Sequence, residues 1–310
     1  MTQLEKLKLF REANKPKPNS IVDIAICRYN NPTSGDMAIC FVFFNSACSK
    51  KLLMNYLYTV EKMKLAKIPY YTMELIFDDR EPEIADAFHV RGNSVLFHKE
   101  SLCNLLEKRI PVYFTKLLFL DADIIFGNPG WYDEVSHLLE TYEAVQPFSS
   151  CVWLDSTYTK EIRTGMSAVR MPIKNSWDWN YHPGFAWAFQ RKWFKEIGWM
   201  KYCVMGHEDT LSVAAWINIK YPSHASMALA YAEYCAIAQP KLSCSTGTVY
   251  HLWHGAIENR KYAERNKLLD GISDIRSILV PNKDGVWEVT NKKIEREMRE
   301  YMIERSDDSV

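Results

Sequence analysis

Lys116-Leu-Leu-Phe-Leu-Asp121-Ala-Asp123-Ile-Ile-Phe126 is the stretch from which the fold can be predicted. Its apolar first half has the composition of a buried strand, and Asp121 and Asp123 follow at positions i and i+2. Carboxylates beside an apolar interior are costly unless cations or hydrogen bonds compensate them. In open α/β sheets, ligands bind at the carboxyl ends of strands. The stretch therefore predicts a site for Mg²⁺ or Mn²⁺ with a diphosphate, although such a turn could also simply enter solvent.

Strand and helix patterns alternate on the amino-terminal side of this stretch. Met37–Phe44 and Tyr70–Phe77 have the length of buried strands. Between them, Ser49 can cap a segment with apolar residues at helical spacing. This alternation predicts an α/β fold with a parallel sheet and crossover helices. We expect a loop or short helix over 78–93 and a short strand over 94–97.

The downstream half has a different character, with seven of the ten Trp between residues 153 and 216. The patterns predict further strands near 184–190 and 248–253 and a helix near 211–219. The segment after residue 255 is highly charged and ends in an amphipathic helix. We expect a lead-in over 1–35, one α/β domain over 36–255 with halves 36–150 and 151–255, and a charged helical extension over 256–310.

Composition excludes some classes of protein. The chain has 310 residues, 47% of them apolar, so a large core can form. Lys+Arg and Asp+Glu both total 38, and a protein that tracks a nucleic-acid backbone would show a basic excess. No apolar leader and no run of about 20 apolar residues is visible. The eight Cys are scattered without a C-x-x-C pair, which favours reduced thiols and an intracellular, soluble protein without a signal peptide or transmembrane segment.

The acidic pair resembles the D-x-D motif of GT-A-fold glycosyltransferases, which use nucleotide-sugar donors. This resemblance implies a GT-A-like (Rossmann-like) mixed, mostly parallel sheet flanked by helices. It also implies that Asp121 lies nearer the nucleoside or the metal and that Asp123 binds the cation, Mn²⁺ or Mg²⁺.

Further residues match positions where the family contacts the nucleotide. Asp78 and Asp79 follow the earlier strand, where relatives place an acidic group near the nucleobase or ribose. They could equally be an exposed loop pair. Lys99 and Asn104 lie where relatives touch the nucleotide.

A second group of residues, Gly206-His-Glu-Asp-Thr210, follows the small-residue strand near Gly184. This order resembles the second half of inverting GT-A enzymes, where a Glu-Asp pair opens a helix beneath the acceptor. The resemblance implies that Asp209 takes the proton from the acceptor hydroxyl and that Glu208 binds the acceptor or sugar, or the reverse. Acidic residues in a first helical turn also complement the helix dipole without any catalytic role.

A third group, His251-Leu-Trp-His254-Gly255, follows a predicted strand. Several metal-dependent GT-A enzymes complete the cation site with a late His, which makes His254 the first candidate ligand and His251 the second. Imidazole added to carboxylate and diphosphate oxygens suits Mn²⁺. A hydrogen-bonded core histidine is the alternative.

The aromatic residues offer candidate sugar contacts. Trp177-Asp-Trp179-Asn-Tyr-His182 mixes flat apolar faces with hydrogen-bonding groups, as a sugar requires. We expect Trp177 or Trp179 to contact a sugar, His182 and Gly184 to line the sugar site, and most of the other Trp to be core residues.

Together these patterns and the resemblance imply a metal-dependent glycosyltransferase, a hexosyl- or pentosyltransferase. It would move a sugar from a nucleotide-sugar donor, with UDP the commonest carrier in D-x-D relatives, to a hydroxyl of a glycan or glycoprotein, with inversion. The alternatives are a retaining, glycogenin-like enzyme, a haloacid-dehalogenase-like phosphatase that requires Mg²⁺, and a carbohydrate-binding protein without activity.

Overall fold

The computed structural model describes residues 28–172, 176–202, 204–256, 259 and 265–308, so most of the predicted lead-in lies outside the described residues. Its central element is a seven-stranded sheet. In spatial order the strands are β3 (Phe88–Gly92), β2 (Tyr70–Phe77), β1 (Met37–Phe44), β4 (Lys116–Leu120), β10 (Ala186–Gln190), β6 (Ala144–Gln146) and β11 (Leu242–Cys244). Among these strands β10 alone runs antiparallel to its neighbours. The predicted mixed, mostly parallel α/β sheet is confirmed.

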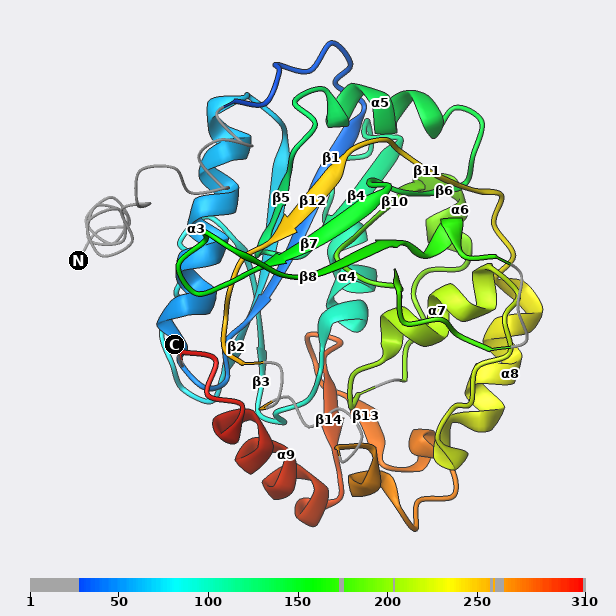
Figure 1. Cartoon of the computed structure of the whole chain (residues 1–310). Helices are drawn as coiled ribbons and strands as arrows, with labels where there is room; N and C mark the ends of the chain where they lie inside the picture. Colours follow the sequence, from blue (N-terminus) through cyan, green and yellow to red (C-terminus); the bar gives the residue numbers. More distant parts are fainter. Residues whose placement is uncertain (1–27, 173–175, 203, 257–258, 260–264, 309–310) are drawn as a thin grey trace.

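A second sheet lies beside the first (Figure 1). Its strands in order are β5 (Ile124–Phe126), β12 (Thr248–His251), β7 (Ser150–Leu154), β8 (Glu161–Ser167) and β9 (Tyr181–His182). The antiparallel pairing of β12 with β5 places His251 opposite Ile124, the residue after Asp123. The second sheet therefore brings the late histidines to the acidic pair.

Helices cover both faces of the central sheet. In the described residues the helices are α3 (Lys50–Leu65), α4 (Lys99–Glu107), α5 (Trp131–Leu138), α6 (Arg191–Glu196), α7 (Glu208–Trp216), α8 (Ala228–Ile237) and α9 (Lys292–Glu304). Short 3-10 turns lie at Ala168–Arg170, Ala225–Met227, Arg265–Leu269 and Ile275–Ser277.

The apolar run of β1 is continuous because both faces of this strand are buried. Ala38 and Cys40 pack in one core cluster with Leu102 of α4. Ile39 packs in the other cluster with Val60 of α3. Ser49 caps α3 as predicted, accepting a hydrogen bond from the backbone N–H of Leu52.

The predicted strand over 94–97 is wrong, and the strand lies instead within the predicted loop over 78–93. β3 pairs in parallel with β2 at the edge of the sheet. In β3, Val90 is buried while His89 and Arg91 are exposed. Charged and polar residues on an edge strand discourage pairing with other chains, and they gave this strand a loop-like composition.

The carboxyl-terminal segment includes strands as well as the expected helix. The hairpin of β13 (Leu279–Pro281) and β14 (Trp287–Val289) precedes α9, and Figure 1 shows both near the lower ends of β2 and β3. Ile294 and Met298 of α9 belong to the same core cluster as α4. Within the described residues, none of the helices combines the length and apolar character needed to cross a bilayer.

Candidate active site

A cavity of about 850 Å³ opens where the strand order of the main sheet reverses. The chain moves from β1 to β2 on one side, whereas β4 lies on the other side of β1. Residues after the carboxyl ends of both strands, Asn45 and Asp121 among them, line the cavity. Open α/β sheets bind ligands at such a switch point. The sequence predicts a site at this carboxyl edge, next to Asp121 and Asp123.

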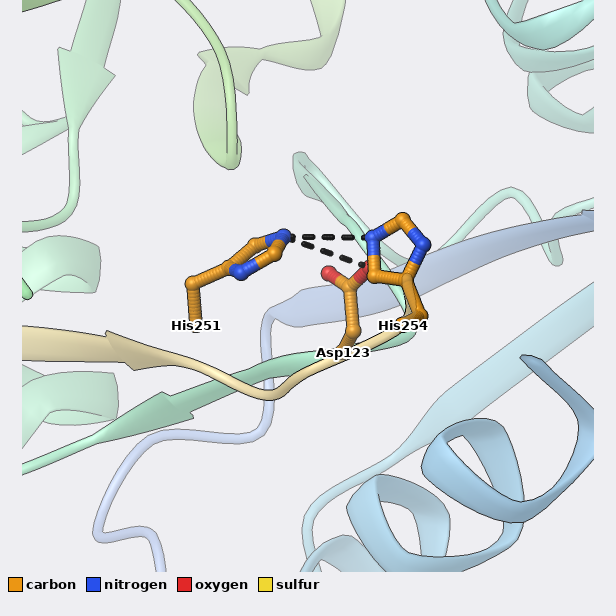
Figure 2. A group of neighbouring side chains, drawn as sticks. All are labelled: Asp123, His251 and His254. Atoms are coloured by element: carbon orange, nitrogen blue, oxygen red, sulfur yellow. Dashed lines mark hydrogen bonds and ion pairs between the residues drawn. The ribbon is translucent and has the colours of Figure 1, made fainter. Parts of the chain in front are cut away.

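Asp123, His251 and His254 form a group that could hold a metal ion (Figure 2). The Nε2 atom of His254 lies 2.9 Å and that of His251 3.7 Å from Oδ2 of Asp123. The two Nε2 atoms are 3.2 Å apart. Figure 2 shows the three side chains pointing toward one another.

The donor atoms fit a single first-row metal ion. Two ligands at right angles around an ion about 2.1 Å from each lie about 3 Å apart, close to the separations found here. Both histidines are buried, and the site opens into the cavity. Imidazole nitrogens favour a transition metal such as Mn²⁺ over Mg²⁺, which prefers oxygen ligands.

Asp121 was predicted as a further metal ligand, but in the described structure its carboxylate faces an ammonium group. Nζ of Lys99, the first residue of α4, lies 2.5 Å from Oδ1 of Asp121. Burial raises the pKa of Asp121 to about 6, the Lys99 charge opposes this rise, and Asp123 adds to it. Burial also disfavours the Lys99 ammonium, but the charges of Asp121, Glu100 and Asp209 outweigh burial and raise the pKa of Lys99. Lys99 is therefore a fixed cation among acidic groups.

Asp209, the predicted base, lies in the first turn of α7 and lines the same cavity. Burial alone would raise its pKa, but Lys99 and His182 outweigh burial, and the net pKa of Asp209 is lowered. The backbone N–H of Thr210 donates a 2.7 Å hydrogen bond to Oδ1. The carboxylate is thus ionised at neutral pH and can accept a proton. Glu208 begins α7, and the structure does not describe its side chain.

The turn between β9 and β10 shapes the cavity wall beside Asp209. The ring of His182 stacks on that of Phe185, with centroids 3.8 Å apart. Burial lowers the pKa of His182 to about 4, so the ring is neutral and its Nδ1 accepts from Gly184 N–H. Phe185 has a left-handed backbone (φ 76°), which is strained for an aromatic residue. Its carbonyl accepts the backbone N–H of Asp121, which ties this turn to the acidic pair.

Trp179 is the predicted sugar contact that the structure places in the cavity. Its side chain is 55% exposed and lies with Tyr221 at the cavity wall, with ring centroids 6.4 Å apart. Trp177 packs behind both rings and does not line the cavity. As expected, most other Trp of this region are buried core residues: Trp153, Trp187, Trp193, Trp199 and Trp216.

Three predicted nucleotide contacts lie outside this cavity. Asp78 pairs with Arg299 of α9, and Asp79 lies beside Asp78 in a separate hollow. The amide of Asn104 exchanges two hydrogen bonds with the Trp199 backbone, with its Nδ2 donating to the carbonyl and its Oδ1 accepting from the N–H. Asn104 therefore has a structural role, because its side chain faces the Trp199 backbone and not the cavity. The spacing in the sequence could not reveal this direction.

Several residues that line the cavity were not predicted from the sequence. Glu100 is buried beside Lys99, and burial raises its pKa to about 8. Arg163 of β8 lies over the Trp153 ring at 4.7 Å. Arg305 and Asp307 come from the chain after α9, within the segment predicted only as a charged helical extension. Only long-range packing brings Arg163, Arg305 and Asp307 to the site, so no local pattern could have identified them, whereas Glu100 directly follows the predicted residue Lys99.

Comparisons with known proteins find no matching protein-family model and no matching curated protein. Among solved structures, the catalytic domain of Drosophila beta1,4-galactosyltransferase 7 in complex with xylobiose is 14% identical. That alignment covers 80% of this chain and 86% of that chain, with a TM-score of 0.39. Glucosyl-3-phosphoglycerate synthase from Mycobacterium tuberculosis, in complex with Mn²⁺, UDP and phosphoglyceric acid, is 12% identical over 88% of this chain and 92% of that chain, with a TM-score of 0.40.

A third similar structure belongs to another kind of enzyme. It is 4-diphosphocytidyl-2C-methyl-D-erythritol synthase from Anaerococcus prevotii, 12% identical over 87% of this chain and 99% of that chain, with a TM-score of 0.34. At these identities and TM-scores, it is the residues of the cavity itself that bear on the function of this protein.

Proposed function

We propose that this protein is a metal-dependent glycosyltransferase that uses a nucleotide-sugar donor. One observation carries the proposal: a site suited to a transition metal and an ionised carboxylate, Asp209, open into the same cavity at the switch point of the sheet. A cation site suits a diphosphate leaving group, and a separate carboxylate suits deprotonation of an acceptor hydroxyl.

The cation would be held by Asp123, His251 and His254, and Mn²⁺ fits these donors better than Mg²⁺. When bound, the ion supplies positive charge that stabilises the departing diphosphate. Lys99 adds a fixed positive charge beside Asp121. We assign Asp121 to the nucleotide side of the donor rather than to the ion.

The transfer itself would use Asp209. The acceptor oxygen forms a bond to the anomeric carbon while the bond from that carbon to the diphosphate oxygen breaks, and its electron pair leaves with the diphosphate. The acceptor proton passes to the Asp209 carboxylate, which the Lys99 charge keeps ionised. Attack from the face opposite the leaving group inverts the anomeric configuration.

The acceptor would be a glycan or glycoprotein, and the sugar-binding side would include Trp179. A half-exposed indole in a cavity wall offers a flat apolar face to a sugar ring. His182 and Gly184 would shape the wall between donor sugar and acceptor, with Glu208 as a further candidate for sugar hydroxyls. UDP is proposed as the carrier.

The direct test incubates the protein with Mn²⁺ and a panel of nucleotide sugars, and measures release of free nucleotide. Asp123→Ala should lose Mn²⁺-dependent donor binding, and Asp209→Asn should keep donor binding but lose nucleotide release. Hydrolysis of simple phosphate esters without nucleotide-sugar binding would instead favour the phosphatase. NMR of the transferred sugar decides the stereochemistry, since a product with the donor's anomeric configuration would remove Asp209 as the base.

A further inference from the structure

The segment Arg305–Asp308, which follows α9, passes directly beside the candidate metal centre. Asp307 is 7% exposed, and its Oδ1 lies 3.6 Å from Nδ1 of His254. The other ring nitrogen of His254, Nε2, faces Asp123. The imidazole thus lies between a carboxylate of the metal centre and a carboxylate of the carboxyl-terminal segment.

Two further contacts hold Asp307 in this position. The guanidinium of Arg305 lies 3.2 Å from Oδ1 of Asp307 and over the ring of Phe97 at 5.5 Å. Next in sequence, Asp308 caps the amino terminus of α3. Its carboxylate accepts from the Ser49 hydroxyl at 2.6 Å and from the backbone N–H groups of Lys50 and Lys51 at 3.1 and 2.9 Å.

Asp308 is therefore an anchor, and Figure 1 shows the chain rising from α9 to the side of α3. An anionic side chain is favourable at a helix amino terminus because unpaired N–H groups and the helix dipole meet it there. The anchor fixes the backbone at one end and α9 fixes it at the other. Asp307 is constrained between them and has little freedom to leave His254.

We propose that Asp307 is a positioning residue for the metal ligand His254, and that the segment Arg305–Asp308 thereby sets the affinity of the metal centre. This inference rests on the metal centre of the proposed function. A histidine that binds an ion through Nε2 carries its proton on Nδ1, and a carboxylate facing that N–H fixes the tautomer and the ring orientation. The 3.6 Å separation closes to a hydrogen bond with a shift of about half an ångström.

The consequence is a coupling between two parts of the chain that are distant in sequence. Asp123 lies between β4 and β5, and the histidines lie at and just after the end of β12, whereas Asp307 comes from the segment beyond the hairpin and α9. A metal centre with three protein donors depends strongly on how each donor is oriented, and loss of such an outer carboxylate costs about 10- to 100-fold in metal affinity.

The experiment is a titration of the metal-free full-length protein with Mn²⁺ alone, in which EPR measures free Mn²⁺. Asp307→Asn keeps the size of the side chain and removes its charge. We expect its Mn²⁺ dissociation constant to rise about 10- to 100-fold, with recovery of nucleotide-release activity at saturating Mn²⁺. The matched control is Glu300→Gln, an exposed acid on α9, which should bind Mn²⁺ as the unaltered protein does.

The outcomes separate this inference from the proposed function. If the unaltered protein binds no Mn²⁺, the metal centre itself is refuted. If it binds Mn²⁺ and Asp307→Asn binds with the same affinity, the positioning role is refuted. Activity that stays low at saturating Mn²⁺ would also refute it, because a positioning defect is overcome by excess metal. Should Asp307→Asn not fold, Asp308→Asn, which releases the anchor, must weaken Mn²⁺ binding in the same direction, and unchanged affinity there overturns the inference.

Discussion

Gly184→Ala tests whether the cavity wall positions Asp209. A Cβ atom added at Gly184 would lie 2.4 Å from Oδ2 of Asp209 and 3.2 Å from Cε1 of His182. Ordinary van der Waals contact begins near 3.4 Å, so the carboxylate must move by about 1 Å. Because no left-handed backbone is required at Gly184, the added methyl group acts through its contacts with Asp209 and His182, of which the Asp209 contact is much the closer.

The expected loss follows from the displacement of the base. A misplacement of about 1 Å costs about 100-fold in rate, so kcat for transfer, or for nucleotide release to water, should fall by about that factor. Donor binding should change little, because the metal centre and Lys99 lie on other elements. Isothermal titration with a UDP-sugar and Mn²⁺ measures binding, and a coupled nucleotide-release assay measures turnover.

A double-mutant cycle shows whether the loss passes through Asp209. In the Asp209→Asn background the base is already absent, so Gly184→Ala should lower the rate little further. Gly35→Ala is the control, since an added Cβ there meets nothing within 4 Å. Full activity of Gly184→Ala, or a loss that is simply additive with Asp209→Asn, would refute the placement of Asp209 as the base.

Three further substitutions test the electrostatics and the scaffold of the site. Lys99→Gln removes the charge that lowers the pKa of Asp209, so the acidic limb of the kcat–pH profile should move to higher pH, and an unmoved limb contradicts this role. Because burial raises the pKa of Glu100 to about 8, its contribution to the free energy of unfolding is present at low pH and is lost as pH rises through that value. In Glu100→Gln, the free energy of unfolding, measured with urea, should therefore decrease less between about pH 5 and 8 than in the unaltered protein. An equally steep decrease in both proteins would contradict the raised pKa of Glu100. Asn104→Ala should cost about 1–3 kcal/mol of stability without changing nucleotide affinity, and weaker nucleotide binding by the folded variant would restore the contact predicted from sequence.

The fold was predictable where local pattern and burial agree. β1 is apolar throughout and β2 is apolar except for Thr72 and Glu74, because the sheet is covered on both faces, and the predicted bounds match the observed ones. β3 was missed because an edge strand alternates buried and exposed residues and resembles a loop. The hairpin β13–β14 has three-residue strands, which are too short to show a periodic pattern.

The candidate site was predictable where residues follow a strand directly. Asp123 and His251 come together because β5 and β12 pair, with Asp123 directly before β5 and His251 the last residue of β12. Asn104 was predicted from the resemblance alone, and the direction of its side chain depends on the rotation of α4, which spacing does not fix. Asp307 lies more than 180 positions from Asp123 in sequence and meets its partner only after the whole chain has folded.

The charged side chains around the cavity should make binding of the nucleotide-sugar donor depend on the metal ion. Lys99 is paired with Asp121, and Arg305 with Asp307, so these cations are already compensated. The acidic, lysine and arginine side chains that line the cavity are Lys99, Arg163, Arg305, Glu100, Asp121, Asp123, Asp209 and Asp307. The described part of the cavity thus offers no excess of positive charge to a diphosphate.

A diphosphate that enters without a metal ion meets Asp123 as a repelling neighbour. Opposite unit charges about 4 Å apart contribute about 4 kcal/mol near a protein surface, so removal of the ion should weaken UDP binding by at least about 100-fold. Titration of UDP in Mn²⁺ and in EDTA measures this ratio. Asp123→Ala is the decisive variant, because it should lose the effect of Mn²⁺ yet bind UDP in EDTA no worse than the unaltered protein. Equal UDP affinity in Mn²⁺ and EDTA would mean that Lys99 and Arg163 suffice for the diphosphate, and the metal would then have no part in donor binding.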